Sequence, residues 1–96
     1  MSKQFCVYIL SNNPRGTTYV GVTSNLPQRV AQHRAKLVEG FTGKYGLETL
    51  VWFEVHENAE SAITREKQIK KWNRLWKIEL VEQKNSDWHD LYDEIL

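Results

Sequence analysis

The sequence predicts a small α+β domain in which helices flank a three-stranded antiparallel sheet. Its 96 residues fit one domain, and they are too few for a TIM barrel, which needs about 250 residues, or for a full doubly wound dinucleotide-binding enzyme. Three short runs of strand-forming residues occur along the chain. Segments with apolar residues at helical spacing follow the second run and the third. The expected order is therefore β-β-α-β-α with a helical tail, in one domain over residues 1–96.

The first two strands are predicted to form a hairpin. Residues 5–10 (FCVYIL) and 17–23 (TTYVGVT) are rich in β-branched and aromatic residues. Residues 11–16 (SNNPRG), which lie between them, are a strong turn signal. Gly21 lies inside the second strand, where a glycine often marks the close approach of another group.

A helix is expected directly after the hairpin. Ser24 or Asn25 is its cap, and Pro27 lies in its first turn. The helix runs to residue 36 or 37, and the positions it buries at helical spacing are Leu26, Val30 and Leu37. A glycine-spaced loop over residues 40–46 leads to the third strand, residues 50–56.

The second half of the chain is predicted to be mainly helical. Asn58 caps a helix over Ala59–Lys71. At 100° per residue an apolar arc continues beyond it, formed by Ala62, Ile69, Trp72, Trp76 and Leu80. A break near residues 72–73, which would give two shorter helices, fits the same pattern. Ser86 or Asp87 is expected to cap a last turn whose apolar residues pack back on the body.

The composition is that of a globular protein of the cytoplasm. Apolar residues make up 41% of the chain and charged residues 26%. No apolar run approaches the roughly 20 residues of a membrane span. The single cysteine, Cys6, excludes an intramolecular disulfide and a cysteine-based zinc site, and it suits a reducing compartment. We therefore expect a cytoplasmic protein without a membrane partner.

The net charge of +1 hides an uneven distribution. Residues 65–77 contain six basic residues and one acid, Glu66. Residues 82–96 contain one basic residue and five acids, which makes an acidic C-terminal tail. The basic segment is typical either of contact with a polyanion or of a solvated helix face, and composition leaves both interpretations open.

Two pairs of residues are candidates for chemistry. Tyr8 and Tyr19 lie on adjacent strands, where a tight hairpin could bring the two rings together, although they could also be ordinary cross-strand aromatics. Arg29 and His33 are four residues apart and share a helix face. Arginine suits phosphate recognition and histidine suits proton transfer, whereas the structural alternative is a solvated polar face.

Two further features are a carboxylate and a loop. Glu66 could hold a divalent metal whose other ligands are water and phosphate, or it could form surface ion pairs of little energetic value. Lys44, between Phe41 and Tyr45, could contact a backbone phosphate beside a stacked base, or belong to a mere turn. With the tyrosines, arginine and histidine, these residues supply a weak base, a cation and a metal-binding acid, which phosphodiester hydrolysis needs.

The ordered set of residues resembles the GIY-YIG nuclease superfamily. Val7-Tyr8-Ile9 is similar to its first motif and Tyr19-Val20-Gly21 to its second, with ten residues between the tyrosines. Val7 stands where the family has its first glycine, a backbone position. Arg29 matches the helix arginine of the family, and His33 matches a position that is often filled by histidine. Glu66 matches the metal-binding glutamate. The similarity is closest to the small single-domain branch.

The resemblance implies an endonuclease that uses Mg²⁺ or Mn²⁺. One tyrosine, helped by the other or by His33, would orient or deprotonate the attacking water. Arg29 would bind the scissile phosphate, and Glu66 would hold the metal. The substrate would be DNA or structured nucleic acid, RNA included, and cleavage would have low sequence specificity unless a protein partner supplied targeting.

The basic residues complete the expected site. Contact with backbone phosphates is expected from Lys44, Lys67, Lys70, Lys71 and Arg74. The alternative function is a nucleic-acid-binding or protein-interaction module that keeps the fold but has weak or no nuclease activity. Metal-dependent cleavage would distinguish the two functions.

Overall fold

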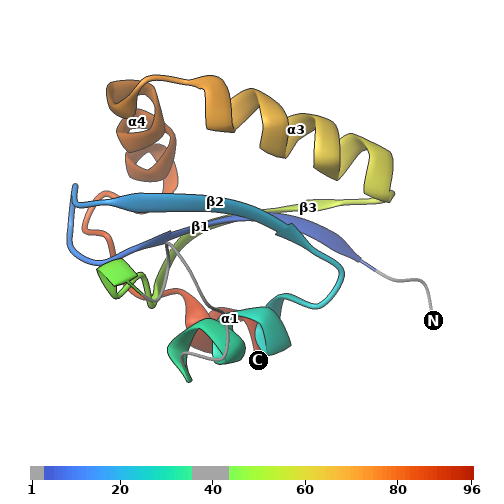
Figure 1. The fold of residues 1–96 in the computed structure, drawn as a ribbon, viewed down its shortest axis with the longest axis horizontal. Coiled ribbons are helices and arrows are strands. Elements are labelled where there is room, and N and C mark those ends of the chain that lie inside the picture. The colour runs from blue at the N-terminus through green and yellow to red at the C-terminus, as the bar shows by residue number, and fades with distance from the viewer. Residues whose placement is uncertain (1–3, 36–43) are drawn as a thin grey trace.

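The sheet is three-stranded and antiparallel, as predicted, with the order β2-β1-β3 (Figure 1). The computed structural model describes residues 4–35 and 44–96. The strands are β1 (Phe5–Ser11), β2 (Thr18–Thr23) and β3 (Thr49–His56). The helices α3 (Ala59–Lys71) and α4 (Arg74–Lys84) cover one face, while α1 (Leu26–Arg34) and the short 3₁₀ helix η1 (Tyr92–Ile95) cover the other (Figure 1).

The central strand β1 divides the core into two layers. Side chains alternate along a strand, so Val7 and Ile9 pack toward α3 and α4 while Tyr8 and Leu10 pack toward α1. These four residues are at most 1% exposed. Both layers therefore depend on β1, which carries the first of the two candidate tyrosines.

Strand pairing extends β1 and β3 by one residue beyond their predicted bounds, whereas β2 begins one residue later than predicted. Ser11 pairs with Thr18 of β2 on one side and with Thr49 of β3 on the other. It is 1% exposed although it belongs to the turn signal in the sequence. Position in a sheet, with a neighbour on both sides, overrides the local preference of serine for a turn.

The first helix starts as predicted, but it ends two to three residues before its predicted end at residue 36 or 37. The Asn25 side chain accepts a hydrogen bond from the Gln28 amide, which decides between the two candidate caps, and Pro27 lies in the first turn. The helix ends at Arg34, with Ala35 as its C-cap. The expectations for Leu37 and for residues 40–43 fall outside the described part of the chain.

The later helical region is broken, as one of the two alternatives predicted. Trp72 has extended backbone angles, φ −68° and ψ 151°, which end α3. Asn73 then caps α4 by accepting a hydrogen bond from the Trp76 amide at 2.9 Å. Asn58 caps α3 in the same way through the Ser61 amide. Asn58 is thus the cap that the sequence predicts, and the cap at Asn73 lies at the predicted break.

Helix α4 is attached to the turn between β1 and β2. The Arg74 guanidinium donates hydrogen bonds to the carbonyl oxygens of Arg15 and Gly16. The Arg15 guanidinium in turn forms a bidentate ion pair with Glu82 at 2.8 and 2.9 Å. Hydrogen bonds from Arg15 and then from Trp88 lower the pKa of Glu82 to about 2. Residues near both ends of α4 thus hold the turn between β1 and β2.

The prediction that Ser86 or Asp87 caps a last turn is wrong. Asn85 organises this segment instead, because its side-chain amide donates to the carbonyl oxygens of Val51 and His89, both at 2.9 Å. The terminal element η1 begins later and has no side-chain cap. The side chain of Asn85 thus joins this segment to β3 as well as to its own following turn.

The acidic tail lies against α1. Arg34 forms an ion pair with Asp90, and its guanidinium lies 4.3 Å from the centroid of the Tyr92 ring. The apolar residues of the tail, Leu91, Tyr92 and Ile95, pack against the core layer of α1. Within the described residues no helix is long and apolar enough to span a bilayer.

Candidate active site

Three aromatic rings from three elements meet at the edge of the sheet formed by β2. The ring centroids of Tyr8 and Tyr19 are 6.3 Å apart, and those of Tyr8 and Tyr19 lie 6.1 and 5.7 Å from the ring of His33. Tyr8 pairs across the strands with Gly21, so Tyr19 is its diagonal neighbour on the same face. His33 reaches the pair from α1. The structure thus brings together three of the residues that the sequence singles out.

Gly21 provides the room that the Tyr8 ring occupies. A Cβ atom at position 21 would lie 2.5 Å from both Cζ and Oη of Tyr8. Gly21 is buried and its φ is not in the left-handed region, so space rather than backbone conformation requires a glycine here. The tyrosine of the first motif and the glycine of the second motif are therefore a complementary pair.

Replacing Gly21 with alanine should displace the Tyr8 ring. Tyr8 is only 1% exposed, so its ring has little free space to enter, and overpacking of this kind typically costs about 1–3 kcal/mol. We expect a lower thermal midpoint and a large loss of the cleavage activity that the sequence motifs predict. Thermal unfolding and cleavage rates measure the two effects, and Val22→Ala is the matched control because Val22 lies on the same strand but not under Tyr8. A Gly21→Ala protein with unchanged midpoint and rate would contradict the steric explanation.

The hydroxyl of Tyr8 is within hydrogen-bond distance of His33. Tyr8 Oη lies 3.2 Å from His33 Nε2, and the two residues are 1% and 3% exposed. Burial, and next the positive charge of Arg29, lower the pKa of His33 below its ordinary value of 6.5. Burial also raises the pKa of Tyr8 above 10. At neutral pH the pair is therefore a phenol beside a neutral imidazole, in which the phenol can donate its proton.

Arg29 completes this side of the cluster. It lies on α1 one turn before His33, is half-buried, and donates to Gln32 Oε1 at 3.4 Å. A hydrogen bond with the Tyr8 hydroxyl is the largest cause of the raised pKa of Arg29. The guanidinium therefore stays charged beside the two tyrosines. Gln32, which the sequence analysis did not single out, holds it, and the i,i+3 spacing from Arg29 is the signal that could have indicated this contact.

Glu66 approaches the cluster from α3. Its side chain is 14% exposed, and its carboxylate lies 3.5 Å from the ammonium of Lys70. That ammonium also lies 5.8 Å from the centroid of the Tyr19 ring, and the charge of Glu66 contributes to the raised pKa of Tyr8. Glu66 and Lys70 therefore belong to the same edge of the sheet as the aromatic rings. The i,i+4 spacing could have predicted their contact.

The donor set at Glu66 fits one kind of metal site. Among the described residues no group of three or more histidine, cysteine, aspartate or glutamate side chains is placed to hold an ion. That excludes, for this part of the chain, a zinc site built wholly from protein ligands. A single carboxylate fits Mg²⁺ or Mn²⁺, because magnesium usually keeps several waters and takes further oxygens from substrate phosphate.

The basic residues expected to bind phosphates have different surroundings. Lys67 and Lys71 are exposed on α3, and Lys70 is 48% exposed beside Glu66. Lys44 is exposed, with its ammonium 5.4 Å from the Tyr45 ring centroid. Arg74, by contrast, uses its guanidinium to hold the β1–β2 turn.

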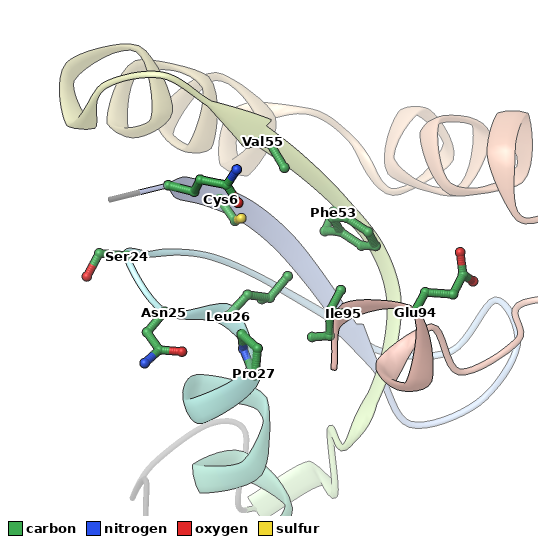
Figure 2. Close-up of a pocket in the computed structure, with 10 residues that line it drawn as sticks. Cys6, Ser24, Asn25, Leu26, Pro27, Phe53, Val55, Glu94 and Ile95 are labelled. Carbon is green, nitrogen blue, oxygen red and sulfur yellow. The ribbon is translucent and has the colours of Figure 1, made fainter. Parts of the chain in front are cut away.

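A cavity lies away from the aromatic cluster. It has a volume of about 760 Å³ and is bounded by the start of α1, by β1 and β3, and by η1 (Figure 2). Cys6, Phe53 and Ile95 contribute to its apolar lining. Burial raises the pKa of the Cys6 thiol, which makes it a poor nucleophile at neutral pH. This cavity therefore shares no residue with the candidate site.

A second polar network, which no sequence motif indicates, lies at the start of α3. His56 contacts Ser61 Oγ through Nδ1 at 2.8 Å and Glu54 Oε1 through Nε2 at 2.7 Å. Arg65 also donates to Glu54, at 3.2 Å. These bonds join the end of β3 to the first two turns of α3, and so fix the helix that carries Glu66.

Comparison with known proteins identifies the family. The family model of the GIY-YIG catalytic domain matches residues 4–79. A UPF0213 protein of Clostridium perfringens is 37% identical over 79 residues, covering 82% of this chain and 84% of the relative. A UPF0213 protein of Syntrophus aciditrophicus is 34% identical over 91 residues, covering 86% and 94%.

A solved structure agrees with this assignment. The solution NMR structure of a UPF0213 protein from Bacillus halodurans superposes with a TM-score of 0.57 at 26% identity, covering 91% of this chain and 92% of that chain. The motif residues, the family match and the shared fold lead to one conclusion. The chain belongs to the GIY-YIG family, the nuclease family that the sequence motifs predict.

Proposed function

We propose that this protein is a metal-dependent endonuclease that hydrolyses phosphodiester bonds in DNA or structured nucleic acid with low sequence specificity. The observation that carries the proposal is the convergence of Tyr8, Tyr19, His33 and Glu66 from β1, β2, α1 and α3 on one edge of the sheet. Arg29 adds a fixed positive charge to the same place. Family membership supports this reaction class.

The two tyrosines have different roles in this proposal. Tyr8 is buried and within reach of His33 Nε2, so it is suited to pass a proton to the imidazole as it receives one from the attacking water. Tyr19 is more exposed and lies beside His33, so its hydroxyl is suited to orient that water. The proton ends on His33, which is neutral before the reaction because of its lowered pKa.

In this proposal Arg29 and the metal site stabilise the negative charge that develops on the phosphate. Arg29 binds the non-bridging oxygens, where negative charge develops during the reaction. Glu66 is the residue that would hold Mg²⁺ or Mn²⁺, and the ion, when bound, supplies a Lewis acid that stabilises the leaving oxygen. Lys44, Lys67, Lys70 and Lys71 contact the backbone around the site, whereas Arg74 supports it through the turn.

A cleavage panel tests the proposal. Wild-type protein is incubated with single-stranded, nicked, flapped and four-way DNA and with RNA, with magnesium and with chelator. We expect metal-dependent products on at least one substrate and none with Glu66→Gln. Binding without metal-dependent products would contradict the enzyme and favour a binding module.

Cleavage should also fall as the pH is lowered below about 6.5. The pKa of His33 is lowered in the folded protein, so the imidazole becomes protonated at a pH below 6.5. Protonation removes the proton acceptor that cleavage needs. As the pH is lowered, the unfolded chain takes up this proton at a higher pH than the folded protein does. The contribution of His33 to the free energy of unfolding is therefore fully present above pH 6.5 and decreases at more acidic pH. Rates and denaturant unfolding over the same pH series measure both. An acid limb centred above pH 6.5 would contradict the role of His33.

A further inference from the structure

The junction of α3 and α4 carries an exposed aromatic groove of about 380 Å³. We call it the tryptophan groove, and its lining residues are Arg65, Trp72, Trp76, Glu79, Leu80 and Gln83. Trp72 and Trp76 meet edge to face, with ring centroids 6.0 Å apart. Trp76 is 53% exposed, which is a large apolar area for a folded protein to leave in water. The candidate active site uses none of these residues.

The groove and the candidate active site lie on opposite flanks of α3. On one flank, Lys70 lies over the Tyr19 ring of β2 and contacts Glu66. On the other, Arg65 bonds Glu54 of β3 and lies 5.4 Å from the centroid of the Trp72 ring. A helix with its side chains is about 10–12 Å across. A few nucleotides of unpaired strand therefore span the distance between the two flanks.

The surface between the flanks is basic. At 100° per residue the outer face of the second half of α3, between Lys70 and Trp72, presents Lys67 and Lys71 beside the uncharged Thr64 and Gln68, and all four are exposed. A phosphate backbone that leaves the active site at Lys70 and crosses this face would meet the ammonium groups of Lys67 and Lys71. An exposed indole at the end of a lysine-lined path is the combination that single-stranded nucleic acids recognise, because bases stack on the ring while cations follow the backbone.

We propose that the tryptophan groove binds an unpaired base of the nucleic-acid substrate, which stacks on Trp76 after the strand has crossed the outer face of α3. The inference rests on the proposed nuclease function and specifies its substrate class: nucleic acid with an unpaired segment next to the scissile phosphate, such as a flap or an overhang. A fully paired duplex keeps its bases stacked on one another and offers none to the groove. Glu79 and Gln83 also line the groove and supply polar groups for the polar edge of a base.

Binding without metal tests this inference separately from catalysis. In chelator, wild-type protein and variants are titrated with a short unpaired oligonucleotide and with a blunt hairpin duplex, while tryptophan fluorescence and fluorescence anisotropy are recorded. The unpaired strand should quench wild-type fluorescence. Trp76→Ala should lose most of that quenching and bind the unpaired strand about tenfold more weakly, the effect of losing about one stacked base. Its affinity for the duplex should stay unchanged.

Two variants serve as controls. Leu75 is 60% exposed and neighbours Trp76 on α4 but does not line the groove, so Leu75→Ala should leave both affinities unchanged. Trp76→Phe retains a ring and should recover most of the lost affinity. Thermal unfolding of each variant confirms that the fold is retained.

The inference would be overturned if Trp76→Ala and Leu75→Ala had equal effects on affinity for the unpaired strand. It would also be overturned if Trp76→Ala lost equal affinity for paired and unpaired strands. A third contrary result would be a wild-type dimer in sedimentation that Trp76→Ala dissociates. The last result would assign the groove to a second copy of the chain. Because these titrations contain no metal, failure of the cleavage panel would contradict the nuclease function and leave the binding result standing.

Discussion

Replacing Glu66 with glutamine should abolish cleavage and leave nucleic-acid binding unchanged or tighter. The substitution keeps the shape of the side chain and removes the charge on which the proposed metal site depends. Binding rests on the surrounding cations, and loss of the carboxylate would also release Lys70 from the ion pair at 3.5 Å. The partner ammonium is 48% exposed, so the ion pair contributes little to stability and the thermal midpoint should move by no more than a few degrees.

The measurement has three parts. Single-turnover cleavage gives the activity, anisotropy in chelator gives the affinity for nucleic acid, and calorimetric titration with Mn²⁺ gives the affinity for metal without reference to turnover. Glu60→Gln is the matched control, because Glu60 is an exposed acid in the first turn of the same helix. If Glu66→Gln cuts as fast as the wild type at the same magnesium concentration, the metal site is misassigned.

Replacing Arg29 with alanine should lower the rate of cleavage on the order of 10²-fold or more, as the loss of a donor to the transition state does. Its guanidinium stands beside Tyr8, and its charge is one of the two causes of the lowered pKa of His33. Removing that charge raises the pKa of His33. The acid limb of the residual activity should therefore move to higher pH, an effect that a purely structural role would not produce.

A pH series of cleavage rates for Arg29→Ala and Arg29→Lys separates charge from geometry. The lysine variant keeps the charge, so its acid limb should stay close to that of the wild type, whereas its rate should remain low because an ammonium cannot donate in the planar fork of a guanidinium. The thermal midpoint should change little, since Arg29 is only half-buried. Wild-type rates for Arg29→Ala would remove this residue from the site.

Local signals account for most of the fold that could be predicted. Asn25, Asn58 and Asn73 each cap a helix by a hydrogen bond to an amide three residues further on, so the cap and its partner lie within the same short stretch of sequence. The turn signal and the strand runs act over similar distances. The failed prediction at Ser86 and Asp87 was also local, and it failed because a bond to β3 determines that segment.

The contacts that define the candidate site cross large sequence separations. Tyr8 and His33 are 25 residues apart, and Lys70 reaches the Tyr19 ring from a helix in the second half of the chain. A pattern of residue types indicates that Tyr8 and Tyr19 are both candidates, but it contains no information on which ring is buried. Packing of α1 against β1 makes Tyr8 the buried partner of His33.

The amino-acid sequence by itself determined the order of elements, the helix starts, the hairpin with Gly21 in its second strand, and the family to which the chain belongs. These features depend on hydrogen bonds and steric limits between near neighbours, or on an ordered set of residue types. Only the tertiary structure decided that Tyr8 is the buried tyrosine, that Arg74 holds a turn, and that the tryptophan groove lies across α3 from Glu66. Burial and distant partners arise when the sheet and helices pack, because each depends on atoms that only the complete fold brings together.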